Sequence, residues 1–215
     1  MKKLLFNILN LEKNDKTMLL LIFVTIGNIV IALTKFIFSV TIPSLWFFVN
    51  ACFLSVLCIS RFFSIKNYGK QRYIKNKKEK EKIGYKNYLY NGVLLVILGI
   101  MYFFVSVYMY YKGTNTIIHE YLTYLVALNS FWSIGWSIYG IIKFKRKSNP
   151  ILKSVKLTSF SNALTSIVLT QVVLLDTYAS DYDLSQVNGY TGMAVSLVII
   201  VIGIYMIINI KKVYE

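Results

Sequence analysis

The amino-acid sequence predicts an all-α fold, a polytopic membrane protein whose residues 1–215 form a single transmembrane domain of six bundled helices. Three observations predict this class. Hydrophobic residues make up 56% of the chain and charged residues 15%, and the mean hydropathy is +0.57, too apolar for a soluble core with a polar coat. The charged residues gather in short stretches between long apolar runs, so we expect the apolar side chains to face lipid.

The predicted spans are apolar runs of about 20 residues, and each can cross roughly 30 Å of hydrocarbon at about 1.5 Å per residue. The two prolines, Pro43 and Pro150, lie only at span boundaries, where they interrupt no helix. The spans cover residues 18–40, 43–63, 88–111, 116–142, 154–175 and 190–210, and basic cytoplasmic loops are expected at 61–87 and 143–153.

Lysine and arginine residues set the predicted orientation of the bundle. Of the 24 such residues, all but Lys35 and Lys112 lie before the first span, from 61 to 86, from 143 to 156, or after the last span. The opposite side of the membrane carries mostly acidic residues. Because positively charged loops are retained in the cytoplasm, both termini and both basic loops are expected there.

The basic loops indicate a lipid partner and not a nucleic acid. Their Lys and Arg residues lie between apolar spans and do not form a separate basic domain. The Lys-rich segment 75–82 is expected to be a solvated helix or a flexible segment that is attracted to anionic headgroups. The expected partners are therefore the bilayer and its anionic lipids.

Small residues recur every seventh position in two of the spans. Small side chains in register let helices approach closely, so these two spans are expected to pack on each other or on a neighbouring subunit, which includes a homodimer. The alternative is that glycine is simply frequent in membrane helices. The residues are Gly92, Gly99 and Ser106 in the third span and Gly189, Ser196 and Gly203 in the sixth.

Polar residues within the spans are the candidates for a functional site. A polar group in the bilayer is unfavourable without a partner, so these residues are expected to face the bundle interior. One interpretation is structural, since hydrogen bonds between membrane helices contribute about 0.6 kcal/mol each, and the other is a polar pathway. Lys35 either extends its ammonium group to the outer headgroups or is a buried charge. The candidates are Asn28, Lys35, Asn50, Asn129, Asn162 and Thr165.

The segment from Asn28 to Ser55 resembles the first two transmembrane helices of the cation diffusion facilitator family of metal transporters. The family pattern is an Asn, a Lys, a Ser and the tripeptide Ala-Asp-Ala, followed by the metal motif. Here Asn28, Lys35, Ser44 and Asn50-Ala51 stand at the family's spacings, with Asn50 in place of the Asp. The fifth span carries a related sequence, Phe160-Ser161-Asn162-Ala163, which would fit an inverted pair of three-helix units.

The metal-ligand positions of that family, carried over by the resemblance, fall on Phe53 and Leu57 in the second span and on Thr165 and Leu169 in the fifth. Only Thr165 offers a ligand atom for zinc or manganese, and a weak one. The resemblance therefore implies a transporter-like fold without the divalent-metal site and without a cofactor. The sequence is also similar to small six-helix bacterial membrane proteins, which favours a multi-pass protein of a bacterial plasma membrane.

Catalysis is not expected. The only histidine, His119, lies beside Glu120 at the outer start of the fourth span, without a second histidine, paired carboxylates or a nucleophile with its base. The predicted function is transport of a small solute or ion along polar helix faces. The alternative is a non-transporting scaffold, sensor or assembly partner that keeps a transporter-like fold. A continuous polar cavity would favour transport, and an apolar packed bundle would favour the alternative.

Overall fold

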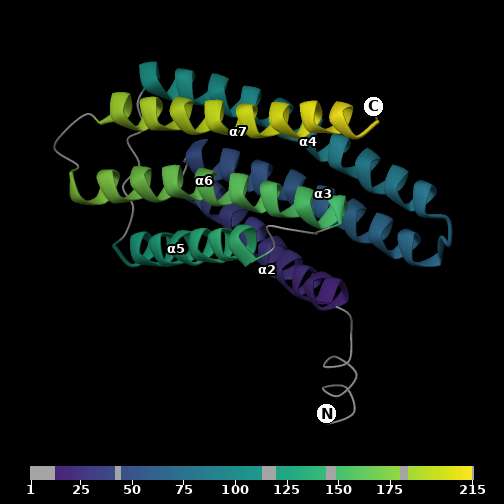
Figure 1. The fold of residues 1–215 in the computed structure, drawn as a ribbon. Coiled ribbons are helices and arrows are strands. Elements are labelled where there is room, and N and C mark those ends of the chain that lie inside the picture. Colours follow the sequence, from purple (N-terminus) through teal and green to yellow (C-terminus); the bar gives the residue numbers. More distant parts are fainter. Residues whose placement is uncertain (1–12, 42–44, 113–119, 144–148, 180–183, 215) are drawn as a thin grey trace, which may run out of the picture.

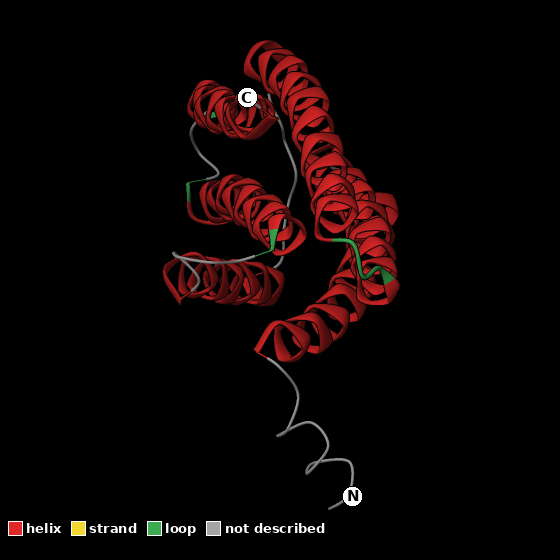
Figure 2. Cartoon of the chain, turned by 45° about the vertical axis from the view of Figure 1, so that its right-hand side comes forward, coloured by secondary structure: helices red, strands yellow, loops and turns green. Residues whose placement is uncertain are grey.

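The computed structural model describes residues 13–41, 45–112, 120–143, 149–179 and 184–214, and all regular structure in these ranges is α-helical (Figure 2). This confirms the predicted six-helix fold. The helices are α2 (Lys13–Thr41), α3 (Leu45–Tyr73), α4 (Lys77–Lys112), α5 (Glu120–Lys143), α6 (Pro150–Tyr178) and α7 (Ser185–Tyr214). They lie in two rows of three, with α2, α3 and α4 in one row and α5, α6 and α7 in the other (Figures 1 and 2).

The helices present apolar side chains to their surroundings, as a membrane protein requires. Phe104, Phe131 and Val201 are each more than 60% exposed, and many other large apolar residues are exposed along the same helices. A soluble monomer rarely exposes so much apolar surface, so these faces are assigned to lipid. In the described part of the chain, four helices are long and apolar enough to cross a membrane: Leu45–Tyr73, Lys77–Lys112, Pro150–Tyr178 and Ser185–Ile210. Within α2, residues Thr25–Val40 form a shorter apolar stretch of helix.

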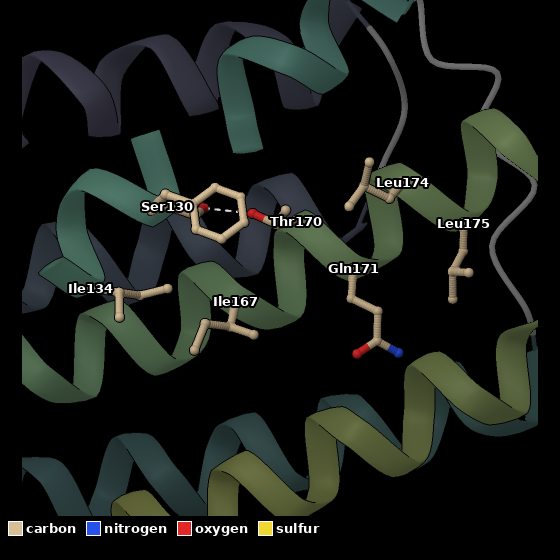
Figure 3. A pocket seen from close by; sticks show the side chains of 8 residues that line it. Ser130, Ile134, Ile167, Thr170, Gln171, Leu174 and Leu175 are labelled. Atoms are coloured by element: carbon tan, nitrogen blue, oxygen red, sulfur yellow. Dashed lines mark hydrogen bonds between the residues drawn. The ribbon is translucent and has the colours of Figure 1, made fainter. Parts of the chain in front are cut away.

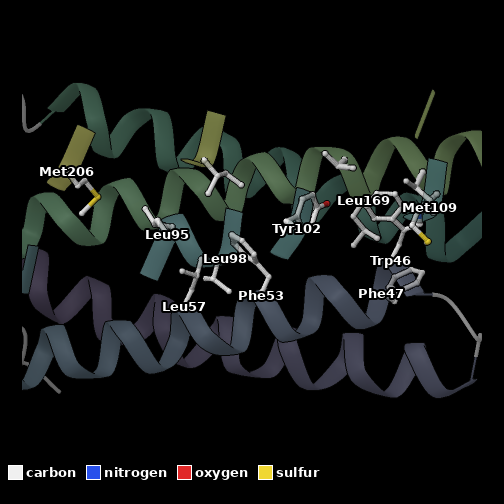
Figure 4. Close-up of a cluster of buried hydrophobic side chains, with 14 of the residues drawn as sticks. Trp46, Phe47, Phe53, Leu57, Leu95, Leu98, Tyr102, Met109, Leu169 and Met206 are labelled. Atoms are coloured by element: carbon white, nitrogen blue, oxygen red, sulfur yellow. The ribbon is translucent and has the colours of Figure 1, made fainter. Parts of the chain in front are cut away.

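The main hydrophobic core lies where the two rows face each other, between α3, α4, α6 and α7 (Figure 4). Large side chains fill it, and the ring of Tyr102 packs against the rings of Trp46 and Phe53 at centroid distances of 6.1 and 6.0 Å. The middle of the bundle is therefore closed by apolar packing. Other members of this core are Phe47, Leu57, Leu95, Leu98, Met109, Leu169, Ile199 and Met206.

The contact between α4 and α7 is the most extensive one among the described helices, and small residues make it close. A Cβ atom on Gly203 would lie 2.8 Å from the carbonyl oxygen of Gly92, and one on Gly99 would lie 3.3 Å from that of Ser196. Gly189 likewise faces the backbone of Ser106. All six small residues singled out in the third and sixth spans thus lie between these two helices.

The expected loop at 61–87 is almost entirely helical, because α3 continues to Tyr73 and α4 already begins at Lys77. We call residues 64–87 the basic hairpin. Asn76 caps the start of α4, since its side-chain oxygen accepts a hydrogen bond from the Lys78 amide at 3.1 Å. Between the two helices only residues 74–76 are non-helical. Of the two expectations for the Lys-rich segment, the structure shows the helix.

One buried glutamine links the basic hairpin to the start of α6 by hydrogen bonds. Gln71 is 2% exposed, donates a hydrogen bond from Nε2 to the Lys80 carbonyl at 2.6 Å, and accepts one from Nδ2 of Asn149 at 2.6 Å. Asn149 also caps α6 by accepting a bond from the Ile151 amide at 3.0 Å. Three elements therefore share one polar contact at this end of the bundle.

Removing this contact is expected to loosen the basic hairpin. Gln71→Ala leaves the Asn149 amide and the Lys80 carbonyl without their partner, which should lower the free energy of unfolding by about 1–3 kcal/mol. Hydrogen exchange of purified protein should speed up between residues 66 and 84. Lys70→Ala, which changes an exposed neighbour on the same helix, is the control. Equal exchange in the two variants would show that Gln71 does not hold the hairpin.

Candidate functional site

The polar residues proposed from the sequence differ in burial. Lys35 and Asn162 are each 7% exposed, Asn50 is 2% exposed and Thr165 is 1% exposed, so these four side chains lie inside the bundle. Asn28 on α2 and Asn129 on α5 are half-buried. The burial of Lys35 as a residue is what the second of its two interpretations, a buried charge, expects.

These six residues do not form one connected cluster. Asn50 donates a hydrogen bond to the carbonyl of Trp46 at 3.0 Å, and the Thr165 hydroxyl bonds the carbonyl of Asn162 at 2.9 Å, so both bonds stay within one helix. In the described ranges, no side-chain to side-chain hydrogen bond joins any two of the six. The expected site near the middle of the membrane is therefore a set of separate buried polar groups.

A different set of polar residues forms a connected network. It lies at the end of the bundle from which the basic hairpin extends, and it joins three helices. We call it the amide–hydroxyl cluster, and it consists of Ser60 and Ser64 on α3, Asn87 and Asn91 on α4, and Ser154 on α6. Each of these five side chains is 2% exposed or less.

Two asparagine amides hold the cluster together. Nδ2 of Asn87 donates to the hydroxyls of Ser64 at 3.0 Å and Ser154 at 3.2 Å, and Nδ2 of Asn91 donates to the same two oxygens at 3.2 and 3.1 Å. The Ser60 hydroxyl donates to Oδ1 of Asn91. The cluster therefore concentrates neutral oxygen and nitrogen groups in an otherwise apolar interior, and it contains no carboxylate, imidazole or thiol.

Sequence reasoning missed the cluster because two of its five residues, Ser64 and Asn87, fall in the expected loop 61–87. The signal was nevertheless present, since Ser60 and Ser64 are four residues apart, as are Asn87 and Asn91, and residues at that spacing share one helix face. Recognising the pairs required the knowledge that α3 and α4 are helical through the basic segment.

Arg61 departs from its expected role as a cytoplasmic topology signal. The side chain is 1% exposed and lies inside the bundle, where Nη2 donates a hydrogen bond to the hydroxyl of Ser159 on α6 at 3.0 Å. Its neighbours Phe62 and Phe63 are exposed. The sequence position of Arg61 indicates how far along the helix it lies. It does not indicate that the side chain points into the bundle, while those of Phe62 and Phe63 point outward.

A cavity of about 300 Å³ lies between α5 and α6 (Figure 3). Two hydroxyls at its wall bond each other, Thr170 donating to Ser130 at 2.6 Å, while Gln171 bonds Thr191 of α7 at 2.9 Å. The rest of the wall is apolar, with Phe131, Ile134, Ile167, Leu174 and Leu175. This cavity contains none of the candidate residues from the sequence and does not reach the amide–hydroxyl cluster.

Two rows of helices with a lipid-facing apolar surface define a polytopic helical membrane protein. Residues 21–211 match the family of the cation efflux transmembrane domain. The chain therefore belongs to the cation efflux family, and the resemblance noted in the sequence is confirmed. No curated protein matches the sequence. Membership assigns a membrane transporter-like function for cations, in a family of transporters and not of enzymes.

The positions at which the resemblance placed the family's metal ligands are occupied by apolar packing. Phe53, Leu57 and Leu169 are members of the main hydrophobic core and are each 3% exposed or less. Thr165 is buried as well, and its hydroxyl is bonded to its own helix. Among the described residues, no group of three or more His, Cys, Asp or Glu side chains could hold a metal ion. His119 lies outside the described residues.

Proposed function

We propose that the protein moves a small solute or monovalent ion across the membrane along the polar faces of its helices, without the divalent-metal site of its family. The amide–hydroxyl cluster carries the proposal, because it gathers buried hydrogen-bonding groups from α3, α4 and α6 in one place. Family membership supports movement of a solute across the bilayer. The apolar side chains of Phe53, Leu57 and Leu169 argue against zinc or manganese as that solute.

The chemistry of the cluster suits a weakly held substrate. Amide and hydroxyl oxygens are neutral ligands that bind hard monovalent cations or polar solutes, and they do not hold a transition metal tightly. An Asn side chain both donates and accepts, so Asn87 and Asn91 can exchange their bonds to Ser64 and Ser154 for bonds to a passing solute. Because the apolar core closes the middle of the bundle, the separate buried side chains of Lys35, Asn50 and Asn162 would join this path only when the helices move apart there.

We further propose that both termini and the basic hairpin lie in the cytoplasm of a bacterial cell, beneath its plasma membrane. The exposed lysines of the hairpin, at 77, 78, 80 and 82, would then meet anionic headgroups. This orientation places the amide–hydroxyl cluster at the cytoplasmic end of the path. A homodimer stays a prediction, as does the absence of nucleic-acid binding.

Flux measurements on reconstituted vesicles test the proposed path. Purified protein is placed in liposomes loaded with pH- and cation-sensitive dyes, and Na⁺, K⁺ and proton gradients are applied in turn. Asn91→Leu should reduce the flux at least about tenfold, the effect of ~1.4 kcal/mol on a barrier. Lys35→Ala and Asn50→Ala should reduce it as well.

The control for these variants is Ser55→Ala on the same helix as Ser60. The Ser55 hydroxyl bonds only the carbonyl of Ala51, at 2.8 Å, so its loss should leave the flux unchanged. Equal flux in the wild type, Asn91→Leu and Ser55→Ala would refute a path through the cluster. If folded wild-type protein moves nothing under any gradient, a scaffold or sensor role takes the place of transport.

A further inference from the structure

The guanidinium of Arg61 is enclosed by the bundle and only partly satisfied. It is 1% exposed, and its Nη2 group has the Ser159 hydroxyl as acceptor at 3.0 Å. The Nε and Nη1 groups have no hydrogen-bond partner in the described part of the chain. Ser159 gives its own proton to the Val155 carbonyl at 2.8 Å, so it serves Arg61 as an acceptor. Buried donors are nearly always bonded in native proteins, so two unbonded donors on one side chain point to a ligand.

The chain does not provide a counter-charge for Arg61 within the spans. Of its nine Asp and Glu residues, only Glu120 lies in a predicted span, and it lies at the outer end, away from the basic hairpin. A buried guanidinium is strongly unfavourable without an anion, and arginine stays protonated in proteins, so it cannot escape by losing its proton. An anion from outside the chain would neutralise the charge and accept a hydrogen bond from Nη1.

Three helices surround this position. Cys58 lies one turn before Arg61 on the same face of α3 and packs with Ala32 of α2, while Ser159 brings α6 to the guanidinium. Both free N–H groups point into protein and not into lipid, because Arg61 as a whole is enclosed. A phosphodiester headgroup with two chains attached is too bulky for such a place, whereas a monatomic anion needs the space of a single atom beside the guanidinium.

We propose that Nη1 of Arg61 binds a small inorganic anion of the halide class in the bundle interior, between α3 and α6. The anion neutralises the guanidinium of Arg61. Because Arg61 directly follows Ser60 of the amide–hydroxyl cluster, this also removes a positive charge that would repel a cation at the cluster. Ser159 positions the guanidinium by accepting a hydrogen bond from Nη2, and it leaves Nη1 for the anion. The proposal does not depend on transport, because binding requires no gradient.

Thermal unfolding of the purified protein in detergent tests the site. Chloride is varied against gluconate at constant ionic strength, so that general screening stays the same. A ligand that binds only the folded state raises the melting temperature with the logarithm of its concentration, here by roughly 3 to 5 °C for each tenfold increase above its Kd. Bromide should act like chloride, and gluconate should have no effect.

Variants assign the effect to Arg61. Arg61→Gln should fold, since it replaces the buried charge and its anion together by a neutral side chain, and its melting temperature should be independent of chloride. Arg61→Lys keeps the charge but loses the planar fork, so it should need more chloride for the same shift. Lys70→Gln, an exposed cation on the same helix, should respond like the wild type.

Three results would overturn the halide site. The first is a wild-type melting temperature that is the same in chloride and gluconate. The second is an equal chloride shift in Arg61→Gln and the wild type. The third is stabilisation by phosphatidylglycerol in the micelles that competes with chloride and is lost in Arg61→Gln, which would give the site to a lipid headgroup. Absence of flux in vesicles, by contrast, would leave this binding result unaffected.

Discussion

Gly203→Ala is expected to lower the free energy of unfolding by about 1–3 kcal/mol, although it adds only one methyl group. A Cβ atom at this position would lie 2.7 Å from Cγ2 of Val96, 2.8 Å from the carbonyl oxygen of Gly92 and 2.9 Å from the amide nitrogen of Val96. Two of these three atoms belong to the backbone of α4 and cannot rotate away. The helices would have to separate along their closest contact.

Unfolding in mixed micelles with increasing sodium dodecyl sulfate measures this loss. Gly27→Ala is the matched control, because nothing lies within 4 Å of a Cβ atom at Gly27 on α2, and alanine favours the helix over glycine by roughly 1 kcal/mol. The two substitutions should therefore change stability in opposite directions. Equal stability of Gly203→Ala and the wild type would mean that α4 and α7 do not pack as closely as described.

The second large effect is expected in the amide–hydroxyl cluster. Asn91→Leu keeps a similar volume but removes the two bonds from Nδ2 to Ser64 and Ser154 and the acceptor of the Ser60 hydroxyl. A buried polar group left without its partner costs about 1–3 kcal/mol, so the variant should unfold at a lower denaturant concentration. Its loss of stability should exceed that of Ser55→Ala, whose hydroxyl bonds only its own helix.

A double-mutant cycle separates the network from simple loss of packing. Asn91→Leu and Ser154→Ala are measured alone and together, and residues in one hydrogen-bond network give interaction energies of about 0.5–3 kcal/mol. Hydrogen bonds in membrane proteins lie near the lower end of that range. Strictly additive losses would mean that Asn91 and Ser154 act independently, and the cluster would then be a coincidence of position.

Much of the fold could be predicted from the sequence, because long apolar runs separated by charged stretches are compatible with few structures other than membrane-spanning helices. The six helices follow from hydropathy, and the spacing of Gly92, Gly99 and Gly203 indicated which spans need close neighbours. The spacing did not indicate whether these spans pack on each other or on a second copy of the chain, since both arrangements use the same small residues. Only the structure brings α4 and α7 together.

The candidate site was less accessible to sequence reasoning. Hydropathy indicates where along a helix a residue lies but not which way its side chain points. It therefore does not distinguish the buried Arg61 from the exposed Phe62 beside it. Asn87 was assigned to a solvated loop, because the lysines of segment 75–82 lower the local hydropathy and conceal that α4 already begins at Lys77. The family resemblance singled out Phe53, Leu57 and Leu169 as positions of interest, and all three belong to the main hydrophobic core.

The proposed function requires that this member of the cation efflux family moves a monovalent ion or small solute and not a divalent metal. Its most direct test compares the two in the same wild-type proteoliposomes, with Na⁺ or K⁺ gradients on one half of the preparation and Zn²⁺ or Mn²⁺ gradients on the other. The proposed function predicts saturable flux of a monovalent ion above empty vesicles and no protein-dependent flux of either metal. Saturable Zn²⁺ or Mn²⁺ flux would contradict it and would require metal ligands other than the apolar side chains of α3 and α6.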